Sequence, residues 1–246
     1  METMTTPQAP ILHYIYDPLC GWCYAASPLV RAAAEIDGLA IRLHGGGMMA
    51  GPYARRVTPE LRDYVMPHDR RIHELTGQPF GDDYFDGLLR NPDAVFDSAP
   101  PITAILAAGA IPHAPDDLPL RMLTRVQHAH YAEGRQISER GVLEALAEEL
   151  GATRADFAHA FDACAGHPTD LHIDHSRTLL GTLGGQGFPT FALERGGEYL
   201  VIDMGRWLGQ PERWRDMLRQ QLDGAQPAAV GEEPAGPECW PDGCAT

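Results

Sequence analysis

The 246-residue sequence predicts an α/β protein in which a long helical segment interrupts the strands of one sheet. Signals for a strand, a helix and a second strand follow one another in residues 11–44, about the length of one βαβ unit. Helical periodicity dominates from about residue 50 to 183. Two further strand signals and a last helix lie within 190–222. We therefore expect both ends of the chain to contribute strands to the sheet.

Local residue patterns predict the first strand, helix and strand. Residues 11–16 are β-branched, aromatic or apolar and stop at Asp17, which is typical of a short buried strand. A helix is expected from Cys20 to about Ile36. Residues 39–44 then alternate as a second strand does, and three successive glycines end that pattern.

The later elements are predicted in the same way. The middle segment repeats apolar residues at helical spacing, and Thr153 with Asp156 has the pattern of a helix N-cap pair. Near the end, residues 190–193 and 199–202 predict a β-hairpin, because two glycines between them favour a reversal of the chain. A final helix is expected from about 211 to 222, with its apolar residues on one face.

These elements predict how the chain divides. We expect residues 10–48 and 184–223 to form one domain and residues 49–183 to form an inserted helical domain. Residues 224–246 hold four prolines, four glycines, four acidic residues and no basic residue. Such a segment buries too little apolar surface to fold alone, so we expect a flexible C-terminal tail.

The charge of the chain excludes several classes of partner. Its formal net charge is −15, and an acidic surface repels phosphate backbones and anionic lipid headgroups, so neither nucleic acid nor a membrane is expected as a partner. All 19 basic residues are arginine, which excludes Schiff-base chemistry on lysine. The N-terminus lacks the basic start and apolar run of a secretory signal, and a cytoplasmic location is expected.

The strongest candidates for catalytic residues in this sequence are Cys20 and Cys23. Cys20 falls where the first strand meets the first helix, and the unpaired N–H groups of a helix N-terminus stabilise a thiolate there. The two-residue gap places Cys23 about one helical turn further on, close enough to form a disulfide. We expect an exposed attacking sulfur on Cys20 and a shielded resolving sulfur on Cys23, the asymmetry that thiol–disulfide exchange requires.

Half of a zinc site is the main alternative for two cysteines at this spacing. Zinc needs two further ligands, and the other cysteine pair, Cys239 and Cys244, lies at the far end of the chain. His172 and His175, with aspartates beside them, could place two ligands on one helix face but are more typical of a solvated helix start. No metal and no organic cofactor are expected, because thiol–disulfide exchange moves electrons between sulfur atoms.

Two prolines agree with a dithiol enzyme. Pro28 lies five residues after Cys23, where it would kink the predicted helix, and Pro189 directly precedes the third strand, a place where cis peptide bonds occur. Together with the dithiol, the hairpin and the last helix, they resemble the thioredoxin superfamily. The helical insertion, with the motifs at 16–24 and 185–191, is similar to the DsbA-like family and within it to cytosolic FrnE-like thiol–disulfide oxidoreductases.

This resemblance implies a thioredoxin fold, a central mixed β-sheet flanked by helices, with a large all-helical insertion. It implies that Cys20 is the nucleophile, that Cys23 is the resolving thiol and that the peptide bond before Pro189 is cis and faces the dithiol. The residues that it implies for substrate binding are Trp22, Phe188, Pro189 and Thr190. No positive charge lies between the two sulfurs, so the redox direction stays open.

Three interpretations of Cys239 and Cys244 remain open. The pair could be a redox relay that exchanges with the first dithiol, a clip for a soft metal, or a tail without a role. The preceding flexible span could reach about 20 Å or more, so contact is physically allowed, and FrnE-like proteins with a second cysteine pair favour the relay. Cys164, alone on a predicted helix, is expected to be a small buried hydrophobe.

At two other places in the sequence a structural role competes with a functional one. Asp17 could tune the thiolate, since a nearby carboxylate raises the pKa of a thiol, but a turn residue before a proline is favoured. His128 and His130 are two residues apart and are expected on different helix faces, so they do not form a pair.

The predicted function is that of a thiol–disulfide oxidoreductase or protein disulfide isomerase acting through Cys20 and Cys23. Its expected partners are disulfide-containing or unfolded proteins and a recycling system such as thioredoxin or a low-molecular-weight thiol. Two alternatives remain open. One is a glutathione-dependent isomerase or transferase of the same fold, and the other is a thiol-based metal buffer or redox sensor.

Overall fold

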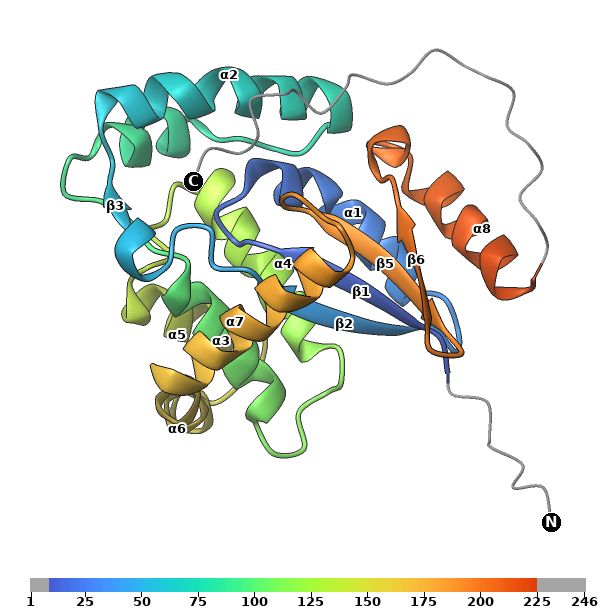
Figure 1. The fold of residues 1–246 in the computed structure, drawn as a ribbon. Coiled ribbons are helices and arrows are strands. Elements are labelled where there is room, and N and C mark those ends of the chain that lie inside the picture. Colours follow the sequence, from blue (N-terminus) through green and yellow to red (C-terminus); the bar gives the residue numbers. More distant parts are fainter. Residues whose placement is uncertain (1–8, 225–246) are drawn as a thin grey trace.

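The computed structural model describes residues 9–224 and is built on a four-stranded sheet (Figure 1). The strands are β1 (Ile11–Tyr16), β2 (Ala40–Gly45), β5 (Thr190–Arg195) and β6 (Glu198–Ile202), in the order β2-β1-β5-β6. β1 runs parallel to β2 and antiparallel to β5, and β5 runs antiparallel to β6. The sheet is therefore mixed and takes strands from both ends of the chain, as predicted.

The central strand β1 is buried along its whole length, as its apolar sequence predicts. Alternate residues of a strand point to opposite faces, and Tyr14 and Tyr16 belong to the main apolar cluster. Tyr14 lies opposite Phe191 of β5, and the two rings stack with centroids 4.7 Å apart. This aromatic layer fixes the register of the two strands, because a shift by one residue would turn it to the other face.

Helices cover both faces of the sheet (Figure 1). α1 (Gly21–Ala34) packs against α8 (Pro211–Leu222), the last helix, whose Trp214 is fully buried. Alanines on α1 are buried and allow this close packing, and Pro28 lies inside the helix. α7 (His167–Thr182) contacts β2. The helix that begins at the dithiol therefore lies in the middle of the protein.

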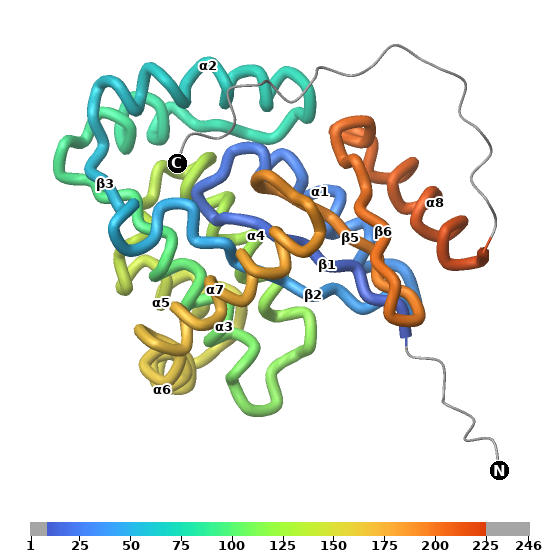
Figure 2. Tube along the Cα trace, in the orientation of Figure 1, coloured from blue at the N-terminus to red at the C-terminus, as the bar shows by residue number. Residues whose placement is uncertain are grey.

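The middle of the chain is largely helical, as its periodicity predicts (Figure 2). Besides α7, it contains α2 (Pro59–Thr76), α3 (Ala99–Ala110), α4 (Leu118–Tyr131), α5 (Arg140–Glu149) and α6 (Arg154–Cys164). One apolar cluster runs from β1 and α1 into these helices without a break. The helical segment and the sheet therefore share a core.

Short elements of this segment differ from the prediction of a purely helical insertion. β3 (Arg55–Arg56) and β4 (Val95–Phe96) form an antiparallel ladder of two residues each, too short to give an alternating signal. Single turns complete the chain, at η1 (Gly51–Tyr53), η2 (Asp83–Gly87), η3 (Leu88–Arg90) and η4 (Gly205–Trp207). The β-hairpin is tighter than expected, because β5 and β6 extend until only residues 196–197 remain between them.

Local predictions about the helices are confirmed. The Thr153 side chain accepts a hydrogen bond from the backbone N–H of Asp156 and caps α6. His128 is exposed whereas His130 is buried, so the two lie on different sides of α4. Cys164, in contrast, is only half-buried, because it is the last residue of α6 and lies at the rim of the core.

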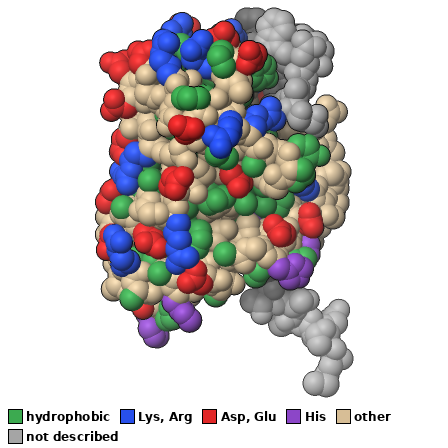
Figure 3. Space-filling model, turned by 90° about the vertical axis from the view of Figure 1, so that its left-hand side faces the viewer, with side chains coloured by type: hydrophobic (Ala, Val, Ile, Leu, Met, Phe, Trp, Pro, Cys, Tyr) green, Lys and Arg blue, Asp and Glu red, His purple; other side chains and the backbone are tan. Residues whose placement is uncertain are grey.

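Arginine and acidic side chains intermix over the face that carries β3, α5 and α6 (Figure 3). Several of them pair within or between helices, for example Arg140 with Glu144 at 2.8 Å and Arg154 with Glu148 at 2.7 Å. Exposed pairs of this kind contribute little to stability. Within residues 9–224, no helix is both long and apolar enough to span a bilayer.

Trp214 is predicted to anchor α8 on the sheet. Its ring meets Phe191 edge-on at 5.1 Å, and its Nε1 has no hydrogen-bond partner among the described residues. Trp214→Ala is expected to lower the free energy of unfolding by about 3–5 kcal/mol, measured by urea denaturation. Trp214→Phe keeps a ring at the contact and removes the unpaired N–H, so a loss under about 1.5 kcal/mol is expected. Equal losses in the two variants would contradict this account.

Candidate active site

Cys20 occupies the N-cap position of α1, where the sequence places it. Its backbone is extended, with φ −92° and ψ 115°, and its Sγ accepts a hydrogen bond from the backbone N–H of Cys23 at 3.4 Å. A side chain at this position satisfies one of the N–H groups that the first helical turn leaves unpaired. The positive end of the helix therefore points at the Cys20 sulfur.

Cys23 lies one turn further along and is fully buried. Its Sγ accepts a hydrogen bond from the backbone N–H of Asp17 at 3.4 Å, and its carbonyl accepts one from the Tyr14 hydroxyl at 3.0 Å. Burial raises the pKa of the Cys23 thiol well above its usual value. Cys23 is therefore a shielded sulfur, as predicted, and its burial favours the protonated thiol.

The expectation of an exposed sulfur on Cys20 is wrong for this structure. Cys20 is only 4% exposed, because the loop before β5 covers it and the Cys20 thiol donates a hydrogen bond to the carbonyl of Phe188 at 3.5 Å. Both cysteines are free thiols. The difference between the two sulfurs is one of surroundings and not of exposure.

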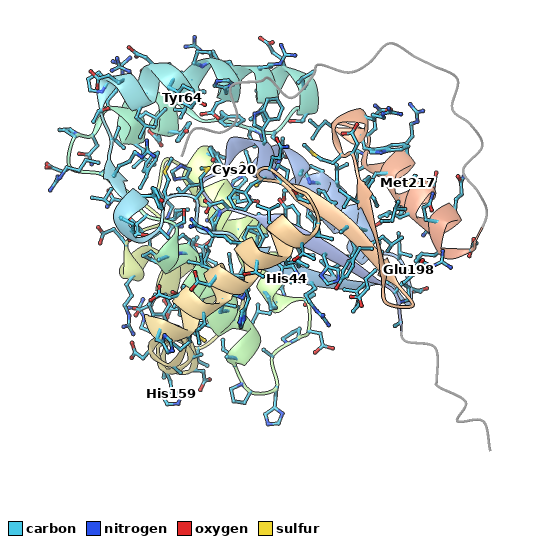
Figure 4. The ribbon with its side chains drawn as sticks, in the orientation of Figure 1. Cys20, His44, Tyr64, His159, Glu198 and Met217 are labelled. Carbon is cyan, nitrogen blue, oxygen red and sulfur yellow. The ribbon has the colours of Figure 1, made fainter. Side chains whose placement is uncertain are left out.

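The peptide bond between Phe188 and Pro189 is cis, as the resemblance implies. Thr190, the first residue of β5, donates from its hydroxyl to the carbonyl of Gly187 at 2.9 Å and so closes the loop. The Phe188 ring lies on the backbone of Gly46, where a Cβ would come within 2.1 Å of the ring. This loop presents the Phe188 carbonyl to Cys20, which lies where β1 leads into α1 (Figure 4). Trp22, between the cysteines, is half-buried.

Asp17 does more than form a turn, although the turn is present. Its carboxylate is fully buried and accepts hydrogen bonds from Leu19 N at 2.8 Å, Ser98 Oγ at 2.9 Å and Met48 N at 2.5 Å. Burial raises the pKa of Asp17 to about 6, and these hydrogen bonds oppose that rise. Ser98 and Met48 were missed because nothing local in the sequence links them to Asp17.

The glycine-rich loop after β2 is held from the other side by α7. Arg177 donates from Nε to the carbonyl of Gly46 at 2.8 Å and from Nη2 to that of Gly47 at 2.7 Å. His172 Nε2 accepts from the backbone N–H of Gly45 at 2.9 Å. Burial lowers the pKa of His172, followed by the effect of His175, and this favours the neutral ring that can accept the bond.

Within residues 9–224, no group of three or more metal-binding side chains is arranged to hold a metal ion. His172 is engaged by the glycine-rich loop through its Nε2. Cys239 and Cys244 lie outside the described residues, so the interpretations of that pair remain predictions.

Comparison with known families identifies the fold. The model of the DsbA-like thioredoxin domain matches residues 11–212. The chain belongs to the DsbA-like thioredoxin family. No curated protein matches it. The fold class predicted from the sequence is thus confirmed, including the helical insertion within the thioredoxin fold.

Solved structures extend this result. The cytosolic disulfide reductase DsbM from Pseudomonas aeruginosa is 60% identical, with a TM-score of 0.81 over 87% of this chain and 100% of DsbM. A structure of DsbM with GSH is 58% identical, with a TM-score of 0.80 over 87% of this chain and 99% of that one. The DsbA-like protein described here is accordingly a thiol–disulfide oxidoreductase.

Two more distant structures share the fold alone. One, from Nitrosomonas europaea, is 23% identical, with a TM-score of 0.71 over 88% of this chain and 99% of that one. The other, 2-hydroxychromene-2-carboxylate isomerase, is 18% identical, with a TM-score of 0.56 over 88% of this chain and 99% of that one. The same framework therefore occurs in structures with quite different sequences.

Gly46→Ala is predicted to disturb the site through Phe188. The added methyl group would meet the Phe188 ring at 2.1 Å, so the loop that carries the carbonyl beside Cys20 must shift. We expect a loss of about 1–3 kcal/mol in the free energy of unfolding and slower disulfide reduction in an insulin turbidity assay. Gly181→Ala in α7 is the matched control, since its methyl group would meet no atom within 4 Å. Equal rates for the two variants would contradict this role of Gly46.

Proposed function

We propose that this DsbA-like protein reduces disulfides in the cytoplasm, with Cys20 as the attacking thiol and Cys23 as the resolving thiol. The observation that carries the proposal is the placement of Cys20 as the N-cap of α1, with the Phe188 carbonyl against its sulfur. The 60% identity to a cytosolic disulfide reductase supports both the direction of the reaction and the location.

The reaction then follows from the surroundings of the two sulfurs. The Cys20 thiolate attacks one sulfur of the substrate disulfide and forms a mixed disulfide, while the other substrate sulfur leaves as a thiolate and takes up a proton. Cys23 loses its proton and attacks the Cys20 sulfur, which releases the second substrate thiol. Two electrons pass from the enzyme dithiol to the substrate, and the enzyme is left with a Cys20–Cys23 disulfide.

Activation of Cys20 changes its contact with the loop before β5. A thiol can donate to the Phe188 carbonyl, but a thiolate has no proton to donate. Ionisation therefore frees this carbonyl and weakens the cover over the sulfur. An extended substrate segment can then pair with the freed backbone, in contact with Trp22, Pro189 and Thr190. These three residues and Phe188 are proposed to form the substrate-binding surface.

The enzyme disulfide must be reduced again before the next turnover. A low-molecular-weight thiol fits this role, since the related DsbM has been solved with GSH. Thioredoxin is the protein alternative. Cys239 and Cys244 are proposed to act as a relay that passes electrons to the Cys20–Cys23 disulfide. The protein substrates are proposed to be disulfide-containing or unfolded chains.

The catalytic roles are tested by reduction of insulin disulfides with dithiothreitol. Cys20→Ser is expected to lose all acceleration, because the attacking sulfur is gone. Cys23→Ser is expected to accumulate a mixed disulfide with the substrate, visible by mass spectrometry, because no second thiol resolves it. Cys164→Ser is the control and should keep the wild-type rate, since Cys164 lies at the end of α6. Full turnover by Cys20→Ser would disprove the proposal.

The tail pair is tested separately by replacing Cys239 and Cys244 with serine in the full chain. A relay predicts an unchanged rate with dithiothreitol, which reduces the first pair directly, and a slower rate when the reductant is thioredoxin or glutathione. Unchanged rates with all three reductants would show that the pair has no part in recycling. Turnover of a glutathione-dependent isomerase substrate by Cys23→Ser would instead favour the alternative function.

A further inference from the structure

A second buried carboxylate lies beside the dithiol. Asp69 of α2 is only 3% exposed. Its Oδ1 lies 2.7 Å from the position that a Cβ on Gly21 would occupy, and Cδ1 of Ile72 lies 3.0 Å from that position. Gly21 is the first residue of α1 and follows Cys20 directly. A carboxylate from the helical segment thus touches the backbone between the two cysteines.

No cation compensates this carboxylate within residues 9–224, which contain every arginine of the chain. The Tyr84 hydroxyl donates a hydrogen bond to Oδ2 of Asp69 at 2.8 Å. Burial raises the pKa of Asp69 to about 7, and the Tyr84 hydrogen bond opposes that rise. A buried carboxyl without a cationic partner is costly to ionise, and such groups concentrate at functional sites.

Asp69 and the two thiols affect the pKa of the same buried hydroxyl, that of Tyr131. Burial raises the pKa of Tyr131, and the further causes are Tyr84, Asp69, Cys20 and Cys23. Coulombic effects fall with distance, so these groups surround one interior region. Tyr131 comes from α4, Tyr84 from η2 and Asp69 from α2. The helical segment therefore places several titratable side chains near the dithiol.

We propose that Asp69 is a positioning residue that makes the Cys20–Cys23 pair a stronger reductant. Asp69 acts through the N-terminus of α1, whose positive end stabilises a nearby anion. When the Asp69 carboxylate and the Cys20 thiolate are both ionised, they share this stabilisation and each receives less of it. The inference rests on the proposed function, because it takes Cys20 as the attacking thiol. It assigns Gly21 a role as well, since any side chain there would displace the carboxylate.

The effect on the reaction follows from the charges of the two redox states. In the proposed reaction the reduced pair attacks as a thiolate on Cys20, whereas the disulfide carries no charge. Repulsion from Asp69 therefore destabilises only the reduced pair and drives the transfer of two electrons to the substrate disulfide, which becomes two thiols. By the same linkage, oxidation of the pair makes Asp69 easier to ionise.

The test is the redox equilibrium of the full-length protein in mixtures of reduced and oxidised dithiothreitol. The fraction of Cys20 and Cys23 in the disulfide is read by alkylation and mass spectrometry. About one pH unit above 7, Asp69→Asn is expected to shift the equilibrium roughly three- to thirtyfold toward the reduced pair. About one unit below, the shift should shrink towards none, because the wild-type carboxyl is then protonated.

Two further variants separate charge from structure. Asp63→Asn removes an exposed carboxylate from the same helix and should leave the equilibrium unchanged. Tyr84→Phe removes the hydrogen bond to Oδ2, which raises the pKa of Asp69 further. Near pH 7 it should give a smaller shift in the same direction as Asp69→Asn, and it provides the test if Asp69→Asn does not fold.

The outcomes distinguish this inference from the proposed function. If the wild-type pair cycles and Asp69→Asn has the wild-type equilibrium at both pH values, the role of Asp69 is disproved while the function stands. A shift of equal size at both pH values would also overturn it, because a structural effect does not follow the ionisation of the carboxyl. If the wild-type pair forms no disulfide in any mixture, the proposed function itself fails.

Discussion

The geometry of the dithiol depends on the buried carboxylate of Asp17. Leaving such a group without hydrogen bonds would cost several kcal/mol, so its three donors have to be in place whenever the protein is folded. Those donors come from the turn before α1, from Met48 after the glycine-rich loop and from Ser98 at the start of α3. The same residue presents its backbone N–H to the Cys23 sulfur. One side chain thus ties the position of the dithiol to the helical segment.

Two aspartate carboxylates lie beside the dithiol. The Asp17 carboxylate raises the pKa of Cys23 while the Asp17 backbone N–H lowers it, and Asp69 touches the backbone of Gly21 at the positive end of α1. Helix N-termini that carry an activated thiolate stabilise the reduced form, which makes an oxidant. The negative charges of Asp17 and Asp69 weaken that stabilisation, and Trp22 adds no cation to restore it. The electrostatics of the site therefore agree with a reductase.

Local patterns were enough to predict the four strands of the main sheet, the start of α1, the dithiol and the proline before β5, because each depends on residues close together in sequence. Contacts between distant segments were not predicted. Asp17 and Ser98 are 81 residues apart, and the cover over Cys20 comes from Phe188, 168 residues away. Helical periodicity shows that α2 has an apolar face but not which helix it meets, so Asp69 gave no signal. The prediction of an exposed Cys20 failed for the same reason.

The burial of Cys20 limits how a substrate disulfide can reach it. The loop before β5 covers the sulfur and packs on the glycine-rich loop, and the two loops are not equally free. Arg177 holds the carbonyls of Gly46 and Gly47, and Asp17 holds the next N–H in the chain, so the glycine-rich loop is fixed at both ends. A Cβ on Gly187 would meet no atom within 4 Å. The hydrogen bond that the Cys20 thiol donates to the Phe188 carbonyl is lost when Cys20 ionises. The loop before β5 is therefore the freer of the two, and in the proposed reaction the ionisation of Cys20 releases its hydrogen bond to this loop.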